Sequence, residues 1–119
     1  MMRYARAQTA MDDRECIVHN NTPVTGEVVD HADNGTMVLL KAYRDGREHG
    51  LQQEWYSDGI PQSKYLVIDD CLRGVAMDWH RNGVLARRQE FDQFGQLRRR
   101  ECWAEDGTAR PDEGSVWPQ

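Results

Sequence analysis

The sequence has no long apolar run. None of its stretches approaches the roughly 20 apolar residues that a membrane-spanning helix needs. The opening residues, Met1 to Arg6, carry charge, and no apolar segment follows them, which disfavours a secretory signal peptide. We therefore expect a cytoplasmic protein.

Cysteine and positive charge are also in short supply. The three cysteines, Cys16, Cys71 and Cys102, are odd in number and far apart, a pattern that predicts free thiols rather than a disulfide framework. Lys and Arg number 15 against 20 Asp and Glu, for a formal net charge of -5. Because nucleic acids are polyanions, this balance disfavours nucleic-acid binding.

Motifs for catalysis or metal binding are missing as well. The four histidines have no helical i, i+4 spacing, and no cysteine pair forms a Cys-x-x-Cys knot. Asp69 and Asp70 are candidates for a paired acid and base, but they fall where a solvent-exposed turn is expected. The sequence therefore predicts a protein without enzymatic activity, cofactor or metal.

What the sequence does contain is a period of 24 residues. Glycines recur with this spacing, each preceded by Asn or Asp, and a second glycine series and two columns of large side chains follow the same period. The columns are Gly35, Gly59, Gly83 and Gly107; Gly26, Gly50 and Gly74; Trp55, Trp79 and Trp103; and Tyr43, Val67 and Phe91.

Each Asx-Gly pair is a strong signal for a two-residue type I′ hairpin turn. We predict such turns at Asn34–Gly35, Asp58–Gly59, Asn82–Gly83 and Asp106–Gly107. The predicted fold is all-β, an array of antiparallel β-hairpins from about three 24-residue repeats with an atypical N-terminal cap. Residues 1–21 are the N-terminal segment, with a candidate capping strand at 16–19; residues 22–107 are the repeat domain; and residues 108–119 are a C-terminal tail.

The tryptophan column suggests where the core lies. A residue type that keeps the repeat period fits the shared core of stacked units, so we expect Trp55 and Trp79 to be buried. Strand alternation then directs Glu54, Tyr56 and His80 to the opposite side, toward solvent. Tryptophan is also common at binding hot spots, so an exposed Trp79 that anchors a partner is the alternative.

Residues 43–50, Tyr-Arg-Asp-Gly-Arg-Glu-His-Gly, and 55–59, Trp-Tyr-Ser-Asp-Gly, resemble the MORN-variant repeat. The segment Thr22 to Gly26 is similar to the Pro-x-Thr-Gly opening that precedes the first repeat in that family. The resemblance covers about residues 22–107. The third unit departs from it, with Asp-Cys-Leu-Arg-Gly at 70–74. Bacterial proteins of this kind are classed as YwqK-type antitoxins, so the resemblance implies an antitoxin or immunity protein that neutralises a toxin by direct binding.

An acidic stretch is compatible with that function, because many toxins that act on nucleic acids carry a basic cleft, toward which an acidic face is steered. The residues predicted to contact such a protein partner are Glu54, Tyr56, Asp58, Asp69, Asp70 and His80. The alternative function is a structural scaffold or membrane-surface adaptor. Its signature is a cationic patch for anionic lipid, for which Arg98 to Arg100 are the candidates.

Overall fold

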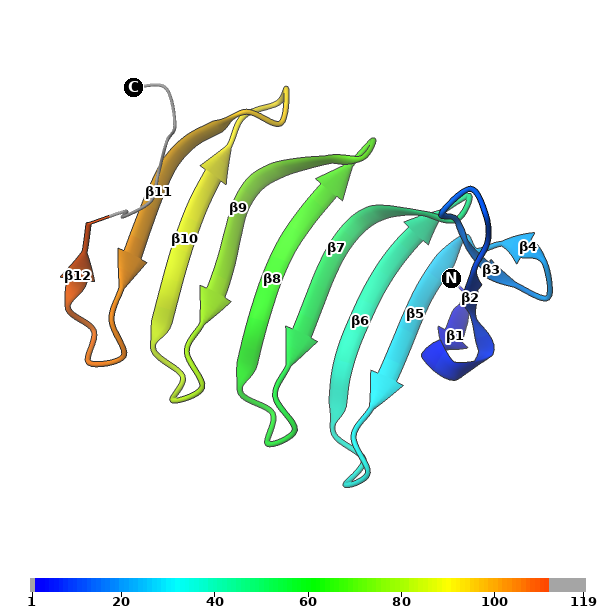
Figure 1. Cartoon of the computed structure of the whole chain (residues 1–119), viewed down its shortest axis with the longest axis horizontal. Coiled ribbons are helices and arrows are strands. Elements are labelled where there is room, and N and C mark those ends of the chain that lie inside the picture. The colour runs from blue at the N-terminus through cyan, green and yellow to red at the C-terminus, as the bar shows by residue number, and fades with distance from the viewer. Residues whose placement is uncertain (1, 112–119) are drawn as a thin grey trace.

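The computed structural model describes residues 2–111, which form two β-sheets (Figure 1). The small sheet has the order β2 (Ala10–Met11), β3 (Ile17–His19), β4 (Thr22–Pro23), and a short 3-10 helix, η1 (Arg6–Gln8), precedes it. The large sheet has nine strands in the order β1-β5-β6-β7-β8-β9-β10-β11-β12. They are β1 (Arg3–Ala5), β5 (Gly26–His31), β6 (Met37–Arg44), β7 (Arg47–Trp55), β8 (Pro61–Ile68), β9 (Cys71–Trp79), β10 (Leu85–Phe91), β11 (Leu97–Trp103) and β12 (Ala109–Arg110).

From β5 onward every strand pairs antiparallel with the next along the chain, and β1 pairs parallel with β5. The predicted all-β array of antiparallel hairpins is therefore confirmed. The strand β3 lies in the segment for which a capping strand was predicted. Of the predicted C-terminal tail, residues 109–110 form β12, whereas residues 112–119 lie outside the described residues.

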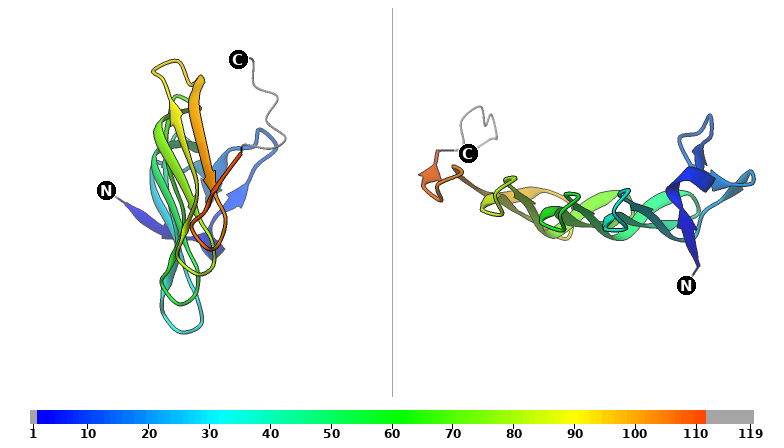
Figure 2. Two further views of the ribbon diagram at one scale, coloured as in Figure 1. Left: turned by 90° about the vertical axis from the view of Figure 1, so that its left-hand side faces the viewer. Right: turned by 90° about the horizontal axis from the view of Figure 1, so that it is seen from below.

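The large sheet is a single layer. Figure 2 shows its strands as one thin twisted sheet, with the small sheet standing off one face at the N-terminal end. The radius of gyration is 16.1 Å, whereas a compact chain of this length has about 13.5 Å. Both faces of the large sheet therefore reach solvent over most of its area.

At one end of the strands the Asx-Gly pairs form three-residue loops. In the first loop the Ala32 N–H donates to the Thr36 carbonyl at 2.8 Å, and the Gly35 N–H donates to the Ala32 carbonyl at 2.9 Å. Gly35 has a φ of 88°, but Asn34 is not among the residues with positive φ. This pattern is a type I turn followed by a left-handed glycine and a bulge. The positions of the predicted turns are correct, and the predicted type I′ geometry is wrong.

Two-residue turns with positive φ at both positions occur at the other end of the strands. They are Asp45–Gly46, with φ of 52° and 83°, and Asp69–Asp70, with φ of 50° and 65°. The flanking residues Arg44 and Arg47 are paired across the first of these turns. At the same end, the link between β10 and β11 is instead a three-residue loop closed by Gly95.

Side-chain contacts tie successive Asx-Gly loops together. The Asn34 amide donates to the Ser57 carbonyl at 2.9 Å, and the Asn82 amide donates to the Glu105 carbonyl at 2.8 Å, in each case 23 residues further on. The side chain of Asp58 has no N–H to donate, and its carboxylate instead accepts a hydrogen bond of 2.7 Å from the Arg81 guanidinium. The loops along this edge of the sheet are therefore held in a row.

The best-packed apolar cluster lies where the small sheet meets the large one. Its buried members are Val24, Val28 and Leu39, and Tyr4, Ile17 and Tyr43 pack against it. The prediction that Trp55 and Trp79 form the core is wrong, because both are only half-buried. Each ends its strand in a single-layer sheet, so no second layer covers it in the part of the chain described.

The cysteines and the absence of a long apolar helix were also predicted from the sequence. Cys16, Cys71 and Cys102 are not joined in disulfides within the described residues, as predicted. Among residues 2–111, no helix has the length and hydropathy to span a membrane.

Candidate functional site

One face of the large sheet, over which the small sheet stands, carries two neighbouring rows of side chains; we call it the cap face. Paired residues of neighbouring strands project to the same side. The register therefore places in one row Asp30, Leu39, Glu54, Ser63, Asp78 and Arg87. It places Lys41, Gln52 and Tyr65 in the next row. Asp30, Glu54 and Asp78, which follow one another at intervals of 24 residues, therefore share one row.

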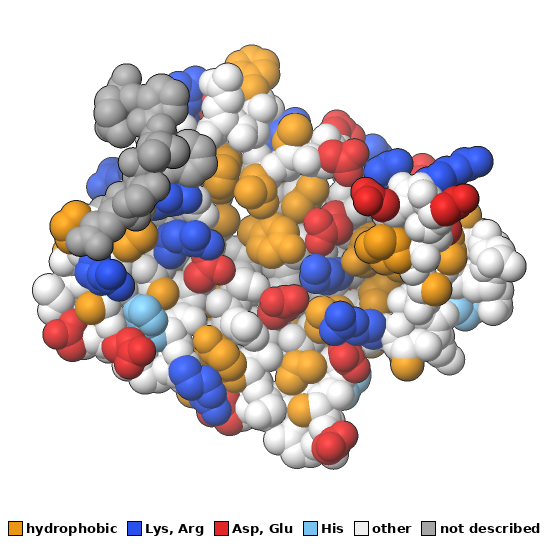
Figure 3. Space-filling model, in the orientation of Figure 1, with side chains coloured by type: hydrophobic (Ala, Val, Ile, Leu, Met, Phe, Trp, Pro, Cys, Tyr) orange, Lys and Arg blue, Asp and Glu red, His pale blue; other side chains and the backbone are white. Residues whose placement is uncertain are grey.

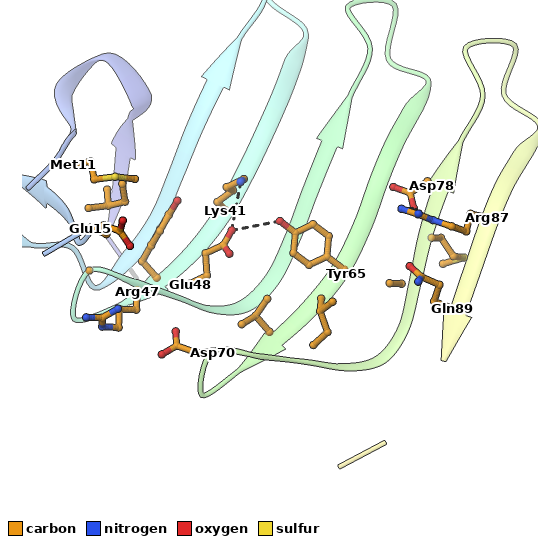
Figure 4. A pocket seen from close by; sticks show the side chains of 17 residues that line it. Met11, Glu15, Lys41, Arg47, Glu48, Tyr65, Asp70, Asp78, Arg87 and Gln89 are labelled. Carbon is orange, nitrogen blue, oxygen red and sulfur yellow. Dashed lines mark hydrogen bonds and ion pairs between the residues drawn. The ribbon is translucent and has the colours of Figure 1, made fainter. Parts of the chain in front are cut away.

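A groove of about 670 Å³ runs across the cap face beside the small sheet (Figure 4). Its wall on the small-sheet side is formed by Met11, Glu15 and Ile17. Apolar and aromatic side chains from the large sheet line the remainder, namely Tyr43, Tyr65, Val67, Leu72 and Ala76. Figure 3 views the molecule from this side and shows apolar side chains gathered near its middle, with charged side chains of both signs among them.

Glu48 is the polar centre of the groove. Its Oε1 lies 3.4 Å from the Lys41 ammonium and accepts a hydrogen bond of 3.4 Å from the Tyr65 hydroxyl. The pKa of Tyr65 is raised to about 12, mainly by burial and to a smaller extent by the negative charges of Glu48 and Glu54. Burial, followed by Glu48, also raises the pKa of Tyr43. Both phenols therefore stay protonated, as hydrogen-bond donors, well into the alkaline range.

The raised pKa of Tyr65 predicts a pH dependence of stability. The folded state retains this proton more tightly than the unfolded chain, whose tyrosine pKa is near 10. The stabilisation is therefore complete below about pH 10 and is lost as the pH rises from about 10 to about 12. We expect the free energy of unfolding to fall more steeply over this window in the wild type than in Tyr65→Phe, measured by urea denaturation. Equal slopes would show that the phenol titrates normally.

The charged groups of the groove leave a small acidic excess. Lys41 is paired with Glu48, and Arg87 is paired with Asp78 at 2.8 Å. Of the other charged residues lining the groove, Glu15, Arg47 and Asp70 have no ion-pair partner within the described residues. The two unpaired carboxylates lie on its rim and remain available to a cation from outside.

The predicted acidic contact residues do not form one surface. Asp70 lines the groove, and Glu54 lies in the cap-face row, where Ser63 donates to it at 3.5 Å. Asp69 lies in the same turn as Asp70 and pairs with Arg44 at 2.9 Å. Asp58 lies at the opposite end of β8, and its hydrogen bond with Arg81 is the largest cause that lowers its pKa. The structure therefore brings only Glu54 and Asp70 to the cap face.

Tyr56 and His80 were predicted to be exposed, and this is wrong. Both are half-buried and follow β7 and β9 in the loops. The Tyr56 hydroxyl donates to the Trp79 carbonyl at 3.1 Å, and the Arg81 guanidinium lies 4.9 Å from the centre of the Tyr56 ring. His80 Nε2 lies 2.7 Å from the Trp103 carbonyl oxygen. Both side chains thus join neighbouring loops, because the bulges at the strand ends turn them toward the next hairpin.

The central residues of the groove were not identified from the sequence. Glu15, Glu48 and Tyr65 come from three different segments, and the register shifts between paired strands hide their common face. One signal was available, since Lys41, Tyr65 and Gln89 form another column of the 24-residue period and all three line the groove. Within residues 2–111, no three His, Cys, Asp or Glu side chains cluster in a way that could hold a metal ion.

No protein-family model, no curated protein and no solved structure matches this chain. Its function must therefore be inferred from the groove, from the charges around it, and from the resemblance of residues 43–59 to the MORN-variant repeat.

Proposed function

We propose that this chain is a non-catalytic repeat protein that binds a basic protein partner on its cap face. We further propose that the partner is a toxin, which the chain neutralises as an antitoxin or immunity protein. The observation that carries the proposal is the groove, with its apolar, tyrosine-lined middle and its unpaired carboxylates on the rim.

The groove has the anatomy of a binding site for a protein segment. Protein interfaces combine a packed apolar and aromatic centre with a polar rim, and tyrosine is among the residues enriched in them. Tyr43 and Tyr65 supply the centre, and Glu15 and Asp70 lie where a lysine or arginine of the partner would meet them. Such a cation gains an ion pair without breaking one that already exists.

The wider cap face adds to this acidic character. With Asp30 and Glu54 in the adjoining row, the groove and row together carry six carboxylates. The cations that face them are Lys41, Arg47 and Arg87, with Arg6 paired to Asp30 at 3.8 Å and Arg100 further along the same face. A negative surface accelerates the approach of a positive partner and repels acidic competitors. A toxin that acts on nucleic acid has such a positive cleft, which makes the implied antitoxin role physically consistent.

The alternative, an adaptor for anionic membranes, needs free cations. Two arginines of the basic cluster are instead bound to carboxylates of the same chain: Arg98 to Asp92 at 2.7 Å and Arg99 to Glu101 at 3.3 Å. Nearby, Arg88 is paired with Glu90 at 2.8 Å. This neutralisation disfavours a lipid-binding patch and favours the acidic cap face as the binding surface.

The proposal predicts partner capture that depends on two carboxylates. The full chain, immobilised, is incubated with lysate of its native cells, and retained proteins are identified and quantified by mass spectrometry. We expect one basic protein in a stoichiometric complex, and at least about a tenfold weaker retention by the variant Glu15→Lys with Asp70→Lys, because each change replaces an attraction by a repulsion.

The matched control makes the same change of charge away from the groove. Asp33 and Glu105 are exposed acids in the loops at the other end of the strands, and neither lines the groove. The variant Asp33→Lys with Glu105→Lys should retain the partner as the wild type does. Retention that is equal in all three proteins, or a partner without basic character, would refute binding in the groove.

A further inference from the structure

The face of the large sheet opposite to the cap face is an apolar surface; we call it the tryptophan face. Trp55 follows the cap-face residue Glu54, and Trp79 follows Asp78, so strand alternation directs both tryptophans to this side. Across β6 to β9 the same alternation and pairing add Leu40, Ala42, Leu51, Gln53, Lys64, Leu66, Arg73, Val75 and Met77. A shallow groove of about 240 Å³ runs between Trp55 and Trp79.

This face is unusually poor in charge for a solvent-exposed sheet. Among the residues just named, Lys64 and Arg73 are the two with a formal charge. Leu51 and Val75, 24 residues apart, are 40% and 37% exposed, and Trp55 and Trp79 are half-buried. A continuous apolar patch of this kind marks a contact surface, because soluble monomers seldom leave one open to water.

The chain exposes more surface than a compact monomer of its mass. The chain exposes 7813 Å², whereas a compact monomer of 13.8 kDa exposes about 6,600 Å². The excess of about 1,200 Å² exceeds the roughly 800 Å² that each partner buries in a standard interface. The exposed face of a single-layer sheet contributes to this excess, because a domain ordinarily buries that face under a second layer.

We infer that the tryptophan face is the contact surface of a homodimer, in which two copies pack their sheets face to face across a two-fold axis. A second copy supplies a sheet of the same dimensions and the same apolar character, so the two layers complete a sandwich. Trp55, Met77 and Trp79 of one copy then lie near the centre of the interface, where large aromatic side chains contribute most.

The charges at the margin of this face fit burial against another copy. On β10 and β11, Arg88 pairs with Glu90 at 2.8 Å and with Glu101 at 3.7 Å, and Arg99 pairs with Glu101 at 3.3 Å. These side chains are compensated within their own chain, so a second sheet nearby leaves no isolated charge. Lys64 and Arg73 have long aliphatic stems that can cover apolar surface while their charged groups reach the solvent.

The dimer is independent of the proposed toxin binding. The cap face points away from the tryptophan face, so both grooves of the dimer remain open, and one dimer presents two partner sites. Failure of one proposal therefore leaves the other intact, because mass measurements on the chain alone test the dimer.

The test is the mass of the purified full chain in solution, measured by sedimentation equilibrium over a range of concentrations. We expect about twice the 13.8 kDa of one chain at micromolar concentrations and above. The variant Leu51→Lys with Val75→Lys should weaken the dimer at least about 30-fold, because each change puts a cation where apolar groups meet. Leu51 and Val75 lie outside the buried core, so the variant is expected to keep the circular-dichroism spectrum of the wild type.

The matched control is Phe94→Lys, which changes a 71% exposed aromatic side chain in the loop between β10 and β11 and leaves the tryptophan face unaltered. This control should dimerise like the wild type. A wild type that stays monomeric at tens of micromolar, or a folded Leu51→Lys, Val75→Lys variant that dimerises with unchanged affinity, overturns the inference.

Discussion

Gln52→Leu should lower the free energy of unfolding by roughly 2–5 kcal/mol, a large share of the stability of a domain of this size. Gln52 is fully buried at 0% exposure. Its amide oxygen accepts from the Ala42 N–H at 3.1 Å, and its amide nitrogen donates to the Ala42 carbonyl at 2.8 Å and to the Gly50 carbonyl at 3.2 Å. Ala42 needs these bonds because the register between β6 and β7 shifts at this residue.

Leucine fills nearly the same volume but offers no hydrogen bond, so the change leaves the backbone groups of Ala42 buried and unsatisfied. The effect is measured as the change in free energy of unfolding by urea denaturation. Gln62→Leu, at an exposed position of β8, is the control and should change it by no more than about 0.5 kcal/mol. A similar small effect for both variants would show that Gln52 does not support the bulge.

Gly46→Ala should destabilise the chain by roughly 2–5 kcal/mol and release the small sheet. Gly46 has a φ of 83°, and a Cβ at this position would lie 2.8 Å from the Cys16 Cβ and 3.1 Å from the Ile17 carbonyl oxygen. The small sheet is fastened at this turn, since the Ile17 N–H donates to the Gly46 carbonyl at 2.8 Å and the Gly46 N–H donates to the Val24 carbonyl at 2.8 Å.

Gly59→Ala separates the backbone strain of a positive φ from the steric clash of an added Cβ, the two causes of the lost stability. Gly59 has a φ of 90°, but a Cβ there meets nothing within 4 Å, so only the backbone strain of about 1–2 kcal/mol remains. Release of the small sheet is followed by thiol labelling of Cys16, which is 8% exposed in the wild type. Faster labelling in Gly46→Ala than in Gly59→Ala is the expected result. Equal rates and equal losses of stability would contradict the contact between the turn and the small sheet.

The periodic glycines were enough to predict the hairpins and one end of each strand. They could not decide the turn type, because Asx-Gly suits both a type I′ turn and a type I turn closed by a left-handed glycine. The choice depends on bonds such as that from the Thr36 N–H to the Asn34 side chain, at 2.9 Å, which stabilises the three-residue loop. The turn at Asp69–Asp70 was recognised only as an exposed turn, since it holds two residues with positive φ and no glycine.

Burial and the site were harder to predict for a different reason. A strict period predicts that Trp55 and Trp79 occupy equivalent positions, but it does not show whether a second layer covers them. Glu48 and Tyr65 meet within the large sheet, but Glu15 joins them only because the N-terminal segment folds over the sheet, a long-range contact that no local pattern encodes. Glu54 and Asp70 were predicted from their negative charge, and both lie on the cap face. Tyr56 and His80 were assigned to the wrong environment because the alternation of side chains fails at a bulge.

The most direct test of the proposed function is the rate at which the captured partner associates with the chain, measured by stopped flow at low and high salt. The variant Glu15→Lys with Asp70→Lys should associate more slowly than the wild type, and the difference should shrink as salt screens the charges. Neutralising Arg98 and Arg99 should leave the rate nearly unchanged. The contrary result, in which the arginine variant fails to associate while the acidic reversal associates normally, would show that the partner is anionic and that the cap face is not its binding surface.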